Sequence, residues 1–460
     1  MTARIWVAAA MTFVALPGGG CATSFEASTV AGAVKASNAF GFGLYGQARK
    51  GKDNFVCSPA GAAIALTMAA AGARGETQAE MLRALHIEST NLDQTYTSFA
   101  AVLAALKDHD GKEGLSLSVA DRVWAQKRFT FRPDYLSILR ERFRAPLAEV
   151  DFKRAPDAAT AAINQWGAAE THGRIPQILG ELDRETVMVL TNAVYLNAKW
   201  RRPFLGSDTR DGGFTTAEGK ITTKMMHQSD AFRYAEVWGA KLVELPYKGG
   251  LSMIVVLPES NDGLSGIEDR LATSYVDWIG ALENRIVDLE LPRFATQTTL
   301  PLVGLLKALG MELAFDACHA DFSGMKDLKR REDGLAFDAC LSGENIYITQ
   351  AIQKAWIETN ERGTEAAAVT VVVMGVNIGL RKGPPLRRAV FHADHPFLYL
   401  IRDVRTGVIL FAGRVVNPAL VSPAVKNPAS NRLLDTSPDA QGAMPGSPEE
   451  EPDSGTGARK

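Results

Sequence analysis

The chain has 460 residues, a net charge of -2 and 46% hydrophobic residues. This composition is ordinary for a globular protein, and the balanced charge excludes a strongly basic surface of the kind that binds nucleic acid. The seven His and four Cys residues show no CxxC or HExxH spacing. The sequence therefore predicts no metal site and no cofactor.

Residues 1–21 have the pattern of a targeting segment. Arg4 precedes the apolar run Ile5–Leu16, which is too short to cross a bilayer but suits the core of a signal peptide. Cys21 follows small residues and resembles a bacterial lipoprotein site, although Gly18 stands where Leu is usual. Ordinary secretion is the alternative. Both place the mature protein outside the cytoplasm, where disulfides persist, and membrane contact is expected only through a lipid anchor.

The next segments in chain order are predicted to be largely helical. Residues 28–50 read as one helix, with Phe40 and Leu44 on one face. Residues 55–85 read as a short strand that enters a buried, Ala-rich helix. Pro59 fits the first turn of that helix and Gly72 its end.

Strands dominate the second half of the chain. Residues 186–200 form a long apolar run, and residues 286–294 alternate between apolar and acidic positions. Residues 396–416 contain two apolar strands around the turn sequence RDVRTG, which predicts a hairpin. This order predicts an α+β fold rather than alternating βαβ units.

The domain boundaries follow from composition. No linker interrupts residues 25–420, which predicts one large domain in spite of the chain length. Residues 421–460 are rich in Pro, Ser, Gly and acids and lack aromatic residues. Such a tail cannot bury enough apolar surface to fold, so it is predicted to be disordered.

No enzyme signature is found. The GFGLYG stretch at 41–46 matches GxGxxG, but it lies inside a predicted helix rather than between a strand and a helix. There is no GxSxG motif, and His172 and His227 have no paired ligand spacing. The sequence therefore predicts no catalytic residue and no enzymatic activity.

The stretch NERGTEAAAVTVVVMGVN at 360–377 has two unlike halves. As a strand, one face would carry Thr364 and then only small or apolar residues, whereas Glu365 would lie on the other face. Gly363 supplies backbone freedom before it, and a Gly/Pro/basic loop follows. The segment suits two states, an exposed loop and a buried strand. A plain core strand is the alternative, but Ala-Ala-Ala is poor strand material.

The sequence ETNERGTEAAAVT closely resembles the hinge of inhibitory serpins. Other blocks resemble serpin segments in serpin order, among them LTNAVYLNAKWRRPF, VELPYKGGLSMIVVLP and FHADHPFLYLIRDVRTGVILFAGRVVNP. The resemblance implies three β-sheets, about nine helices and an exposed reactive-centre loop. It also implies a metastable, monomeric inhibitor of serine proteases, and of cysteine proteases as a second class, whose cleaved loop inserts into the main sheet.

The resemblance assigns roles to three groups of residues. The hinge comprises Glu361, Gly363, Thr364, Glu365, Ala366, Ala367, Ala368 and Thr370; the breach, where insertion starts, comprises Trp200, Arg293 and Glu361; and the shutter, which parts as the strand enters, comprises Ser58, Asn192 and Gln353. Two positions depart from the family pattern. Gln353 stands where many serpins have His, and Gly61 where many have Ser. Since Gln both donates and accepts hydrogen bonds, the shutter is expected to work.

The cleaved bond has two candidates. Counting from the hinge favours Asn377–Ile378, but the loop is longer than usual, which leaves Arg381–Lys382 as the alternative. An Arg at this position would attract trypsin-like proteases.

A repeat of LAFDAC, at 313–318 and 335–340, departs from the family altogether. Cys318 and Cys340 form a disulfide or remain two free cysteines of a surface insertion, and both readings stay open. Cys57 lies in an apolar strand and is expected to be inert.

Three functions compete on these grounds. They are protease inhibition by trapping, a non-inhibitory serpin-fold binder or chaperone, and a hydrolase. The small-residue hinge favours the first, and the missing nucleophile and base count against the third.

Overall fold

The structure is a computed structural model that describes residues 22–50, 53–88, 91–127, 129–326, 345–364 and 386–420, with side chains described from residue 30 onward. All of these residues belong to one compact unit. The predictions for the targeting segment at 1–21 and for the tail at 421–460 lie outside them.

The described residues contain eight α-helices. They are α1 (Ala22–Ala48), α2 (Pro59–Gly72), α3 (Gly75–Ala84), α4 (Leu92–Lys107), α5 (Pro133–Ser137), α6 (Pro156–Glu170), α7 (Leu264–Ala281) and α8 (Leu302–Ala308). The long predicted helix at 28–50 corresponds to α1, which includes the GFGLYG stretch.

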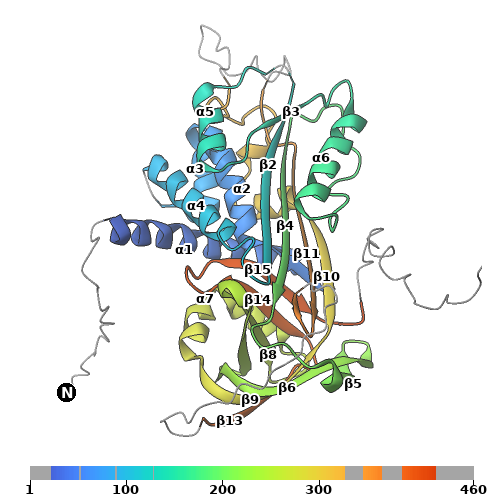
Figure 1. Cartoon of the computed structure of the whole chain (residues 1–460). Coiled ribbons are helices and arrows are strands. Elements are labelled where there is room, and N and C mark those ends of the chain that lie inside the picture. The colour runs from blue at the N-terminus through green and yellow to red at the C-terminus, as the bar shows by residue number, and fades with distance from the viewer. Residues whose placement is uncertain are drawn as a thin grey trace, which may run out of the picture. The chain divides into compact units, whose positions relative to one another are not determined.

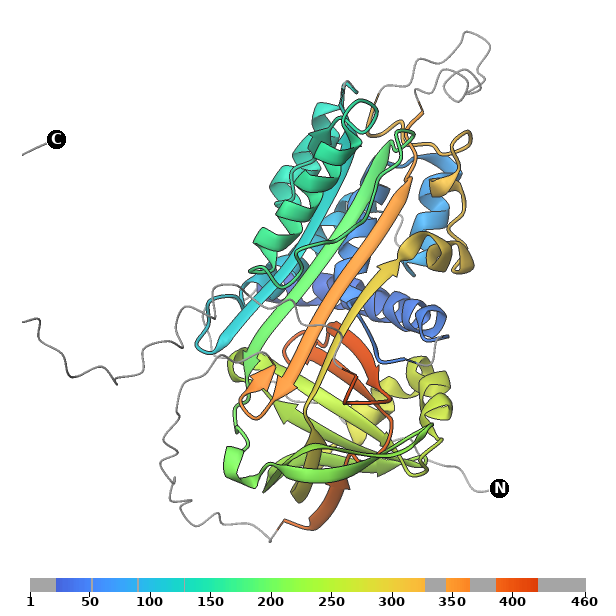
Figure 2. The same ribbon diagram turned by 90° about the vertical axis from the view of Figure 1, so that its right-hand side faces the viewer.

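A six-stranded sheet runs along the length of this unit, and Figure 2 shows it nearly face on. Its strand order is β10-β11-β12-β4-β2-β3. The strands are β10 (Phe294–Pro301), β11 (Gln350–Asn360), β12 (Gly363–Thr364), β4 (Met188–Lys199), β2 (Leu115–Gln126) and β3 (Ala148–Val150). The predicted strand at 186–200 is thus β4, in the middle of the sheet.

The second sheet has nine strands, in the order β1-β15-β14-β8-β7-β6-β9-β13, with β5 paired to β6. The strands are β1 (Phe55–Cys57), β5 (Arg210–Thr216), β6 (Gly219–Val237), β7 (Ala240–Pro246), β8 (Leu251–Pro258), β9 (Glu283–Pro292), β13 (Arg388–His392), β14 (Phe397–Asp403) and β15 (Ile409–Val415). The expected three sheets appear as two continuous ladders because the long strand β6 pairs in turn with β5 (residues 219–225), with β9 (residues 225–234) and with β7 (residues 233–237). The predicted hairpin is β14–β15.

Helix α2 lies behind the six-stranded sheet and is buried at every position. Ser58 caps its N-terminus by accepting a hydrogen bond from the Gly61 N–H, and Pro59 occupies the first turn as predicted. The helix ends at Gly72 as predicted, and Gly72 does not have a positive φ. A Cβ there would come within 2.1 Å of the Met325 side chain, so close packing requires glycine.

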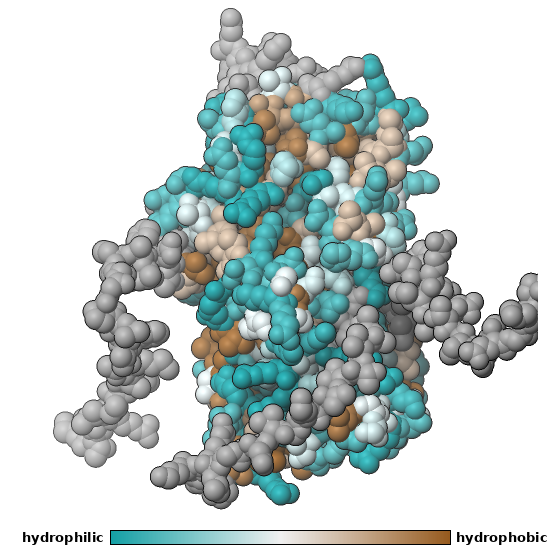
Figure 3. Space-filling view, viewed as in Figure 1, coloured by the Kyte–Doolittle hydropathy of each residue, from teal (hydrophilic) through white to brown (hydrophobic). Residues whose placement is uncertain are grey.

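The two faces of the six-stranded sheet are covered differently. Helix α6 packs on one face, where Trp166 meets Trp124 of β2 at 5.8 Å in an edge-on contact, and α1 to α5 lie on the opposite side (Figure 1). On the surface seen in Figure 3, hydrophilic residues predominate and hydrophobic ones form small patches. Among the described residues, no helix is both long and apolar enough to span a membrane.

Candidate functional site

Strand β11 ends in a tight turn that sends the chain back between the two central strands. Asn360 pairs with Gly363 across this turn, and the Asn360 Oδ1 atom accepts a hydrogen bond from the Arg362 N–H at 3.0 Å. Gly363 has φ 148, and a Cβ there would lie 2.0 Å from the Ala198 carbonyl oxygen. Only glycine fits this position, because the backbone of β4 passes so close.

The short strand β12 pairs with β11 on one side and with β4 on the other (Figure 2). Thr364 therefore lies between Thr359 and Ala198, and its side chain is completely buried. The first residues of the predicted hinge already occupy a strand position in the six-stranded sheet.

The Thr364 side chain contacts Tyr247, which stacks on Trp200. The Tyr247 hydroxyl lies 2.6 Å from the Thr364 Oγ1 atom, and the Tyr247 ring stacks on Trp200 at 4.2 Å. Burial raises the pKa of Tyr247, so the phenol stays neutral and can share a hydrogen bond with the threonine. Trp200 in turn donates from Nε1 to the Asn360 carbonyl oxygen at 2.9 Å.

The carboxylate of Glu361 anchors the turn from the other side. Its Oε1 atom accepts hydrogen bonds from Arg293 Nε at 2.7 Å and from Thr209 Oγ1 at 2.6 Å. Burial acts to raise the pKa of Glu361, but these two hydrogen bonds, a backbone hydrogen bond and the charge of Arg293 together leave the pKa below its usual value. Glu361 therefore stays ionised near neutral pH, and the sequence-predicted Glu361–Arg293 pair is present.

Beyond β12 the slot between the central strands is closed. From Gln350↔Val189 to Trp356↔Tyr195, β11 pairs directly with β4 in parallel. A strand that continued β12 would have to separate these pairs.

The closed part is held by a buried amide network. The Gln353 Nε2 atom donates to Asn192 Oδ1 at 2.7 Å and to the Ser58 carbonyl oxygen at 2.8 Å, and Gln353 Oε1 accepts from the Ser58 N–H at 2.8 Å. The three residues are at most 1% exposed. All three polar groups of the Gln353 amide are thus used, and the network joins α2, β4 and β11.

Two further residues complete this network. Asn192 donates from Nδ2 to the Oδ1 atom of the buried Asp121 at 2.7 Å. Burial raises the pKa of Asp121 to about 7, although the bond from Asn192 and the charge of Lys107 act in the opposite direction. A Cβ on Gly61 would lie 2.4 Å from Asn192 Nδ2, so the absence of a side chain at position 61 makes room for the Asn192 amide.

Residues 35–418 match the family described as Serpin (serine protease inhibitor). This chain belongs to the serpin family. The hinge assignment for the segment that begins at Gly363, and the shutter assignment for the closed amide network, stay predictions.

Curated serpins cover most of the chain. It is 36% identical over 387 residues to an uncharacterised serpin-like protein of Thermococcus kodakarensis, covering 84% of this chain and 85% of the relative. It is 32% identical over 378 residues to leukocyte elastase inhibitor A of Rattus norvegicus, covering 79% and 93% respectively.

Solved serpin structures confirm the fold. The native state of the thermophilic serpin tengpin aligns with a TM-score of 0.71 and 27% identity, covering 84% of this chain and 94% of tengpin. Human thyroxine-binding globulin, solved with thyroxine, aligns with a TM-score of 0.73 and 25% identity, covering 85% and 99%. Proteins named as an elastase inhibitor and as a thyroxine-binding globulin thus both resemble this serpin.

The structure brings together the described members of each predicted group. Trp200, Arg293 and Glu361 surround the turn before β12, and Ser58, Asn192 and Gln353 form one network. Their roles in insertion stay predictions. The other hinge residues, Glu365 to Thr370, both candidate bonds (Asn377–Ile378 and Arg381–Lys382) and the lipidation candidate Cys21 lie outside the described residues.

Three residues of these sites were not singled out from the sequence. Tyr247 lies in the serpin-like block VELPYKGG, which was recognised without a role for the tyrosine. Thr209 and Asp121 carried no signal, because their partners lie 152 and 71 residues away in the chain. Only the folded sheet brings these side chains to the hinge and the shutter.

The cysteines separate into two kinds. Cys57 is a free, fully buried thiol whose pKa is raised by burial, which agrees with an inert core position. Cys318 is disulfide-bonded. Cys340 lies outside the described residues, so the Cys318–Cys340 pairing stays a prediction.

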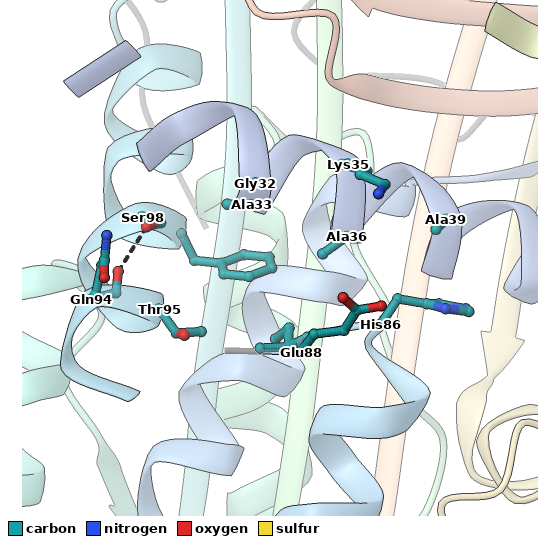
Figure 4. Close-up of a pocket in the computed structure, with 12 residues that line it drawn as sticks. Gly32, Ala33, Lys35, Ala36, Ala39, His86, Glu88, Gln94, Thr95 and Ser98 are labelled. Atoms are coloured by element: carbon teal, nitrogen blue, oxygen red, sulfur yellow. Dashed lines mark hydrogen bonds between the residues drawn. The ribbon is translucent and has the colours of Figure 1, made fainter. Parts of the chain in front are cut away.

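A separate cavity of about 440 Å³ lies between α1, α4 and residues 86–88 (Figure 4). Small residues of α1 form one wall, Phe99 forms another, and Lys35, His86 and Glu88 supply charged or titratable groups. None of the predicted hinge, breach or shutter residues lines it.

Proposed function

We propose that this serpin inhibits serine proteases by trapping, with cysteine proteases as a second target class. The protease would attack the reactive loop and form an acyl-enzyme. The cleaved loop would then enter the six-stranded sheet between β4 and β11 and carry the protease with it. The chain supplies no catalytic group to this reaction.

The position of β12 is the observation that carries the proposal. Thr364 pairs with Ala198 and with Thr359, so each further residue of an inserted loop would meet the preceding residue of both neighbouring strands. On this register Thr370 arrives between Asn192 and Gln353, at the shutter. Val373 arrives between Val189 and Gln350, where the slot ends.

The same register assigns a face to every loop residue. Thr364 is buried, so Ala366, Ala368 and Thr370 would be buried on the same face, whereas Glu365 would lie on the other. Small side chains would thus enter the sheet first, and no charged side chain of the loop would lie on its buried face. At Thr370 a hydroxyl would meet the two amides that now bond to each other.

The energetics favour insertion once the loop is cut. The parallel β11–β4 ladder would be replaced by two antiparallel ladders, and at about 1 kcal/mol per net hydrogen bond the gain is on the order of 10 kcal/mol. Because the register extends to Val373, cleavage must occur beyond it for a full strand to enter. Asn377–Ile378 and Arg381–Lys382 both meet this condition.

Incubation with a panel of proteases tests the proposal. A target protease should form a complex with the protein that survives boiling in detergent, and mass spectrometry of the released peptide should identify the cut bond. If every protease cleaves the loop and remains fully active, the protein is not an inhibitor.

Ligand binding is the second candidate function. The cavity beside α1 supports it, as does the likeness to thyroxine-binding globulin. A binder of this kind has no use for a small-residue hinge held in register between two strands, so inhibition explains more of the chain.

We also propose that the protein works outside the cytoplasm, either secreted or anchored through a lipid on Cys21. The support is the sequence of residues 1–21. Membrane fractionation of wild type and Cys21→Ala tests the anchor, which is excluded if the wild type is wholly soluble outside the cell.

A further inference from the structure

Strand β2 has an unpaired outer edge over most of its length, because β3 pairs with it only at its last three residues. Its pairing with β4 on the other side runs without a bulge. On the side away from β4, the Leu117 N–H donates to Asp110 Oδ1 at 3.1 Å, and the Lys127 N–H donates to the Val150 carbonyl oxygen at 2.8 Å. Odd-numbered residues of β2 therefore direct their N–H and C=O groups away from β4.

Val119 and Asp121 are two of these odd-numbered residues. No described residue bonds to their outward N–H groups, although the two residues are only 4% and 7% exposed. A buried backbone group without a partner is uncommon in folded proteins. The edge of β2 at these two residues is thus a row of hydrogen-bonding groups that is available to a ligand.

A cavity of about 260 Å³, which we call the β2-edge cavity, is lined by residues of β2, α4, α6 and segment 143–145. Asp121 belongs to this lining. Its Oδ1 atom accepts from Asn192, but its Oδ2 atom is buried and has no hydrogen-bond partner among the described residues. Arg122 Nε and Trp166 Nε1 belong to residues of the same lining and are also buried without a partner. Because unsatisfied buried polar groups are costly, three of them around one cavity indicate a polar occupant.

Two cations of the lining lack a salt bridge. Lys107 and Arg144 are exposed, and neither pairs with an acidic side chain of another described residue. Burial raises the pKa of Asp121, and the charge of the nearby Lys107 acts against it. The cavity therefore offers cations on one side and a free carboxylate oxygen on the other.

The rest of the lining is either engaged or apolar. Asp110 already accepts from the Leu117 N–H, and the charge of Glu170 acts on Arg122. The apolar part of the lining comprises Leu103, Leu117, Val119, Phe143 and Ala145.

We propose that the β2-edge cavity binds a free α-amino acid with an apolar side chain, in its zwitterionic form. The ammonium group would donate to Asp121 Oδ2 and to the outward carbonyl oxygens of β2. The carboxylate would accept from the Val119 or Asp121 N–H and lie near Lys107 and Arg144, while the side chain would pack on the apolar part of the lining. The volume is just below the roughly 300 Å³ at which sites for drug-sized ligands begin, which suits so small a ligand. The inference does not depend on the proposed trapping, because binding involves neither the reactive loop nor a protease.

Simpler ligands fit this lining less well. An inorganic anion would meet the cations but would place a like charge near Asp121 Oδ2, and a metal cation or a simple amine would face Lys107 and Arg144. A purely apolar ligand would leave the buried polar groups unsatisfied. Only a ligand with both charges and an apolar part uses the whole lining.

Calorimetric titration of the full, uncut chain with L-leucine tests the site. Leucine should bind once per chain and raise the unfolding temperature. N-acetyl-L-leucinamide has the same side chain but neither charge. It should bind at least about tenfold more weakly, because charge-assisted hydrogen bonds are the stronger ones.

Arg144→Gly and Lys107→Gln test where the ligand lies. Each removes one cation of the lining and should weaken leucine binding about threefold to fivefold. Arg144 has a φ of 51°, which favours glycine, so its replacement should leave the turn folded. Arg140→Gln is the matched control, because Arg140 pairs with the exposed Glu141 and does not line the cavity, and it should bind leucine like wild type.

The absence of any heat or thermal shift with leucine overturns the proposal, as does equally tight binding of the uncharged amide. Equal affinities of wild type and both cation variants would place the ligand elsewhere in the molecule and overturn the site.

Discussion

The two ends of the closed slot differ in what holds them. At the breach, the strand β12 has already entered, and the Glu361 carboxylate and the Trp200–Tyr247 stack hold it there. At the shutter, β11 and β4 are paired directly, and the Gln353 and Asn192 amides bond to each other. At the breach a strand already lies between β11 and β4, whereas at the shutter these two strands are hydrogen-bonded to each other. The barrier to insertion should therefore lie at the shutter.

The largest effect is expected at the breach from Thr364→Arg. Thr364 is already buried against Tyr247 in the uncut chain, so an arginine there should drive β12 out of the slot. Insertion would then have to bury that charge again, at a cost of several kcal/mol. Since each 1.4 kcal/mol slows a step about tenfold, hydrolysis of the acyl-enzyme should overtake insertion. The variant should be cut at the same bond but release active protease.

The measurement is the number of moles of inhibitor needed to silence one mole of protease. Glu365→Arg is the control, because the next position faces outward in the inserted strand, and it should change this ratio far less. Equal ratios for wild type and Thr364→Arg would contradict the two-state interpretation of the hinge.

A moderate effect is expected at the shutter from Gly61→Ala. The new Cβ would lie 2.4 Å from Asn192 Nδ2 and should push the amide away from Gln353 and Asp121. Loss of one or two buried hydrogen bonds costs about 1 to 3 kcal/mol, which should lower the free energy of unfolding. It should also speed insertion of the uncut loop into the six-stranded sheet.

Denaturant unfolding measures the free energy of unfolding, and the rate at which the uncut chain changes to a form with a raised unfolding temperature measures loop insertion. Gly46→Ala is the control, since it adds a Cβ in open space on the helix α1 and should leave the chain equally or slightly more stable. If Gly61→Ala is as stable as Gly46→Ala, the fit of Asn192 against α2 does not limit opening.

The pH dependence of the shutter gives a third comparison. Because burial raises the pKa of Asp121 to about 7, the folded state binds this proton more tightly than the unfolded chain does. The free energy of unfolding should therefore fall as the pH rises from about 4 to about 7, with no further contribution above that. Asp121→Asn should flatten the profile between these values in denaturant titrations.

Asp211→Asn serves as the exposed-carboxyl control, because Asp211 pairs with Lys224 on the surface. A profile for Asp121→Asn as steep as that of wild type would mean that the proton is bound elsewhere.

The smallest effect is expected from Arg293→Gln at the breach. The Arg293 side chain is 48% exposed, so its bond to Glu361 is partly screened by water and should contribute about 1 kcal/mol. Unfolding should become slightly easier while trapping continues. Arg83→Gln, which removes an exposed pair with Glu76, should have no measurable effect, and a larger loss there than at Arg293 would contradict the role of the breach pair.

Much of the fold could be predicted from the sequence because many of its helices and strands are determined by residues close together in the chain. Helix α2 begins at Pro59 after the cap Ser58, and β9 alternates between Val287, Leu289 and Leu291 inside and charged residues outside, as predicted. These features depend on residues close in the chain, where periodicity and capping act. The family resemblance added the order of the blocks and the identity of the hinge.

The sequence by itself thus determined the α+β class and the serpin resemblance, and it predicted the small-residue hinge and the residues of the breach and shutter. Only the tertiary structure decided that β12 is already inserted, that Tyr247 receives Thr364, and that Asp121 extends the shutter network. It also decided that His227 and His392 meet the same carboxylate. The reason is physical: these contacts join strands far apart in the chain, and sheet register, which no local pattern encodes, sets which side chains meet.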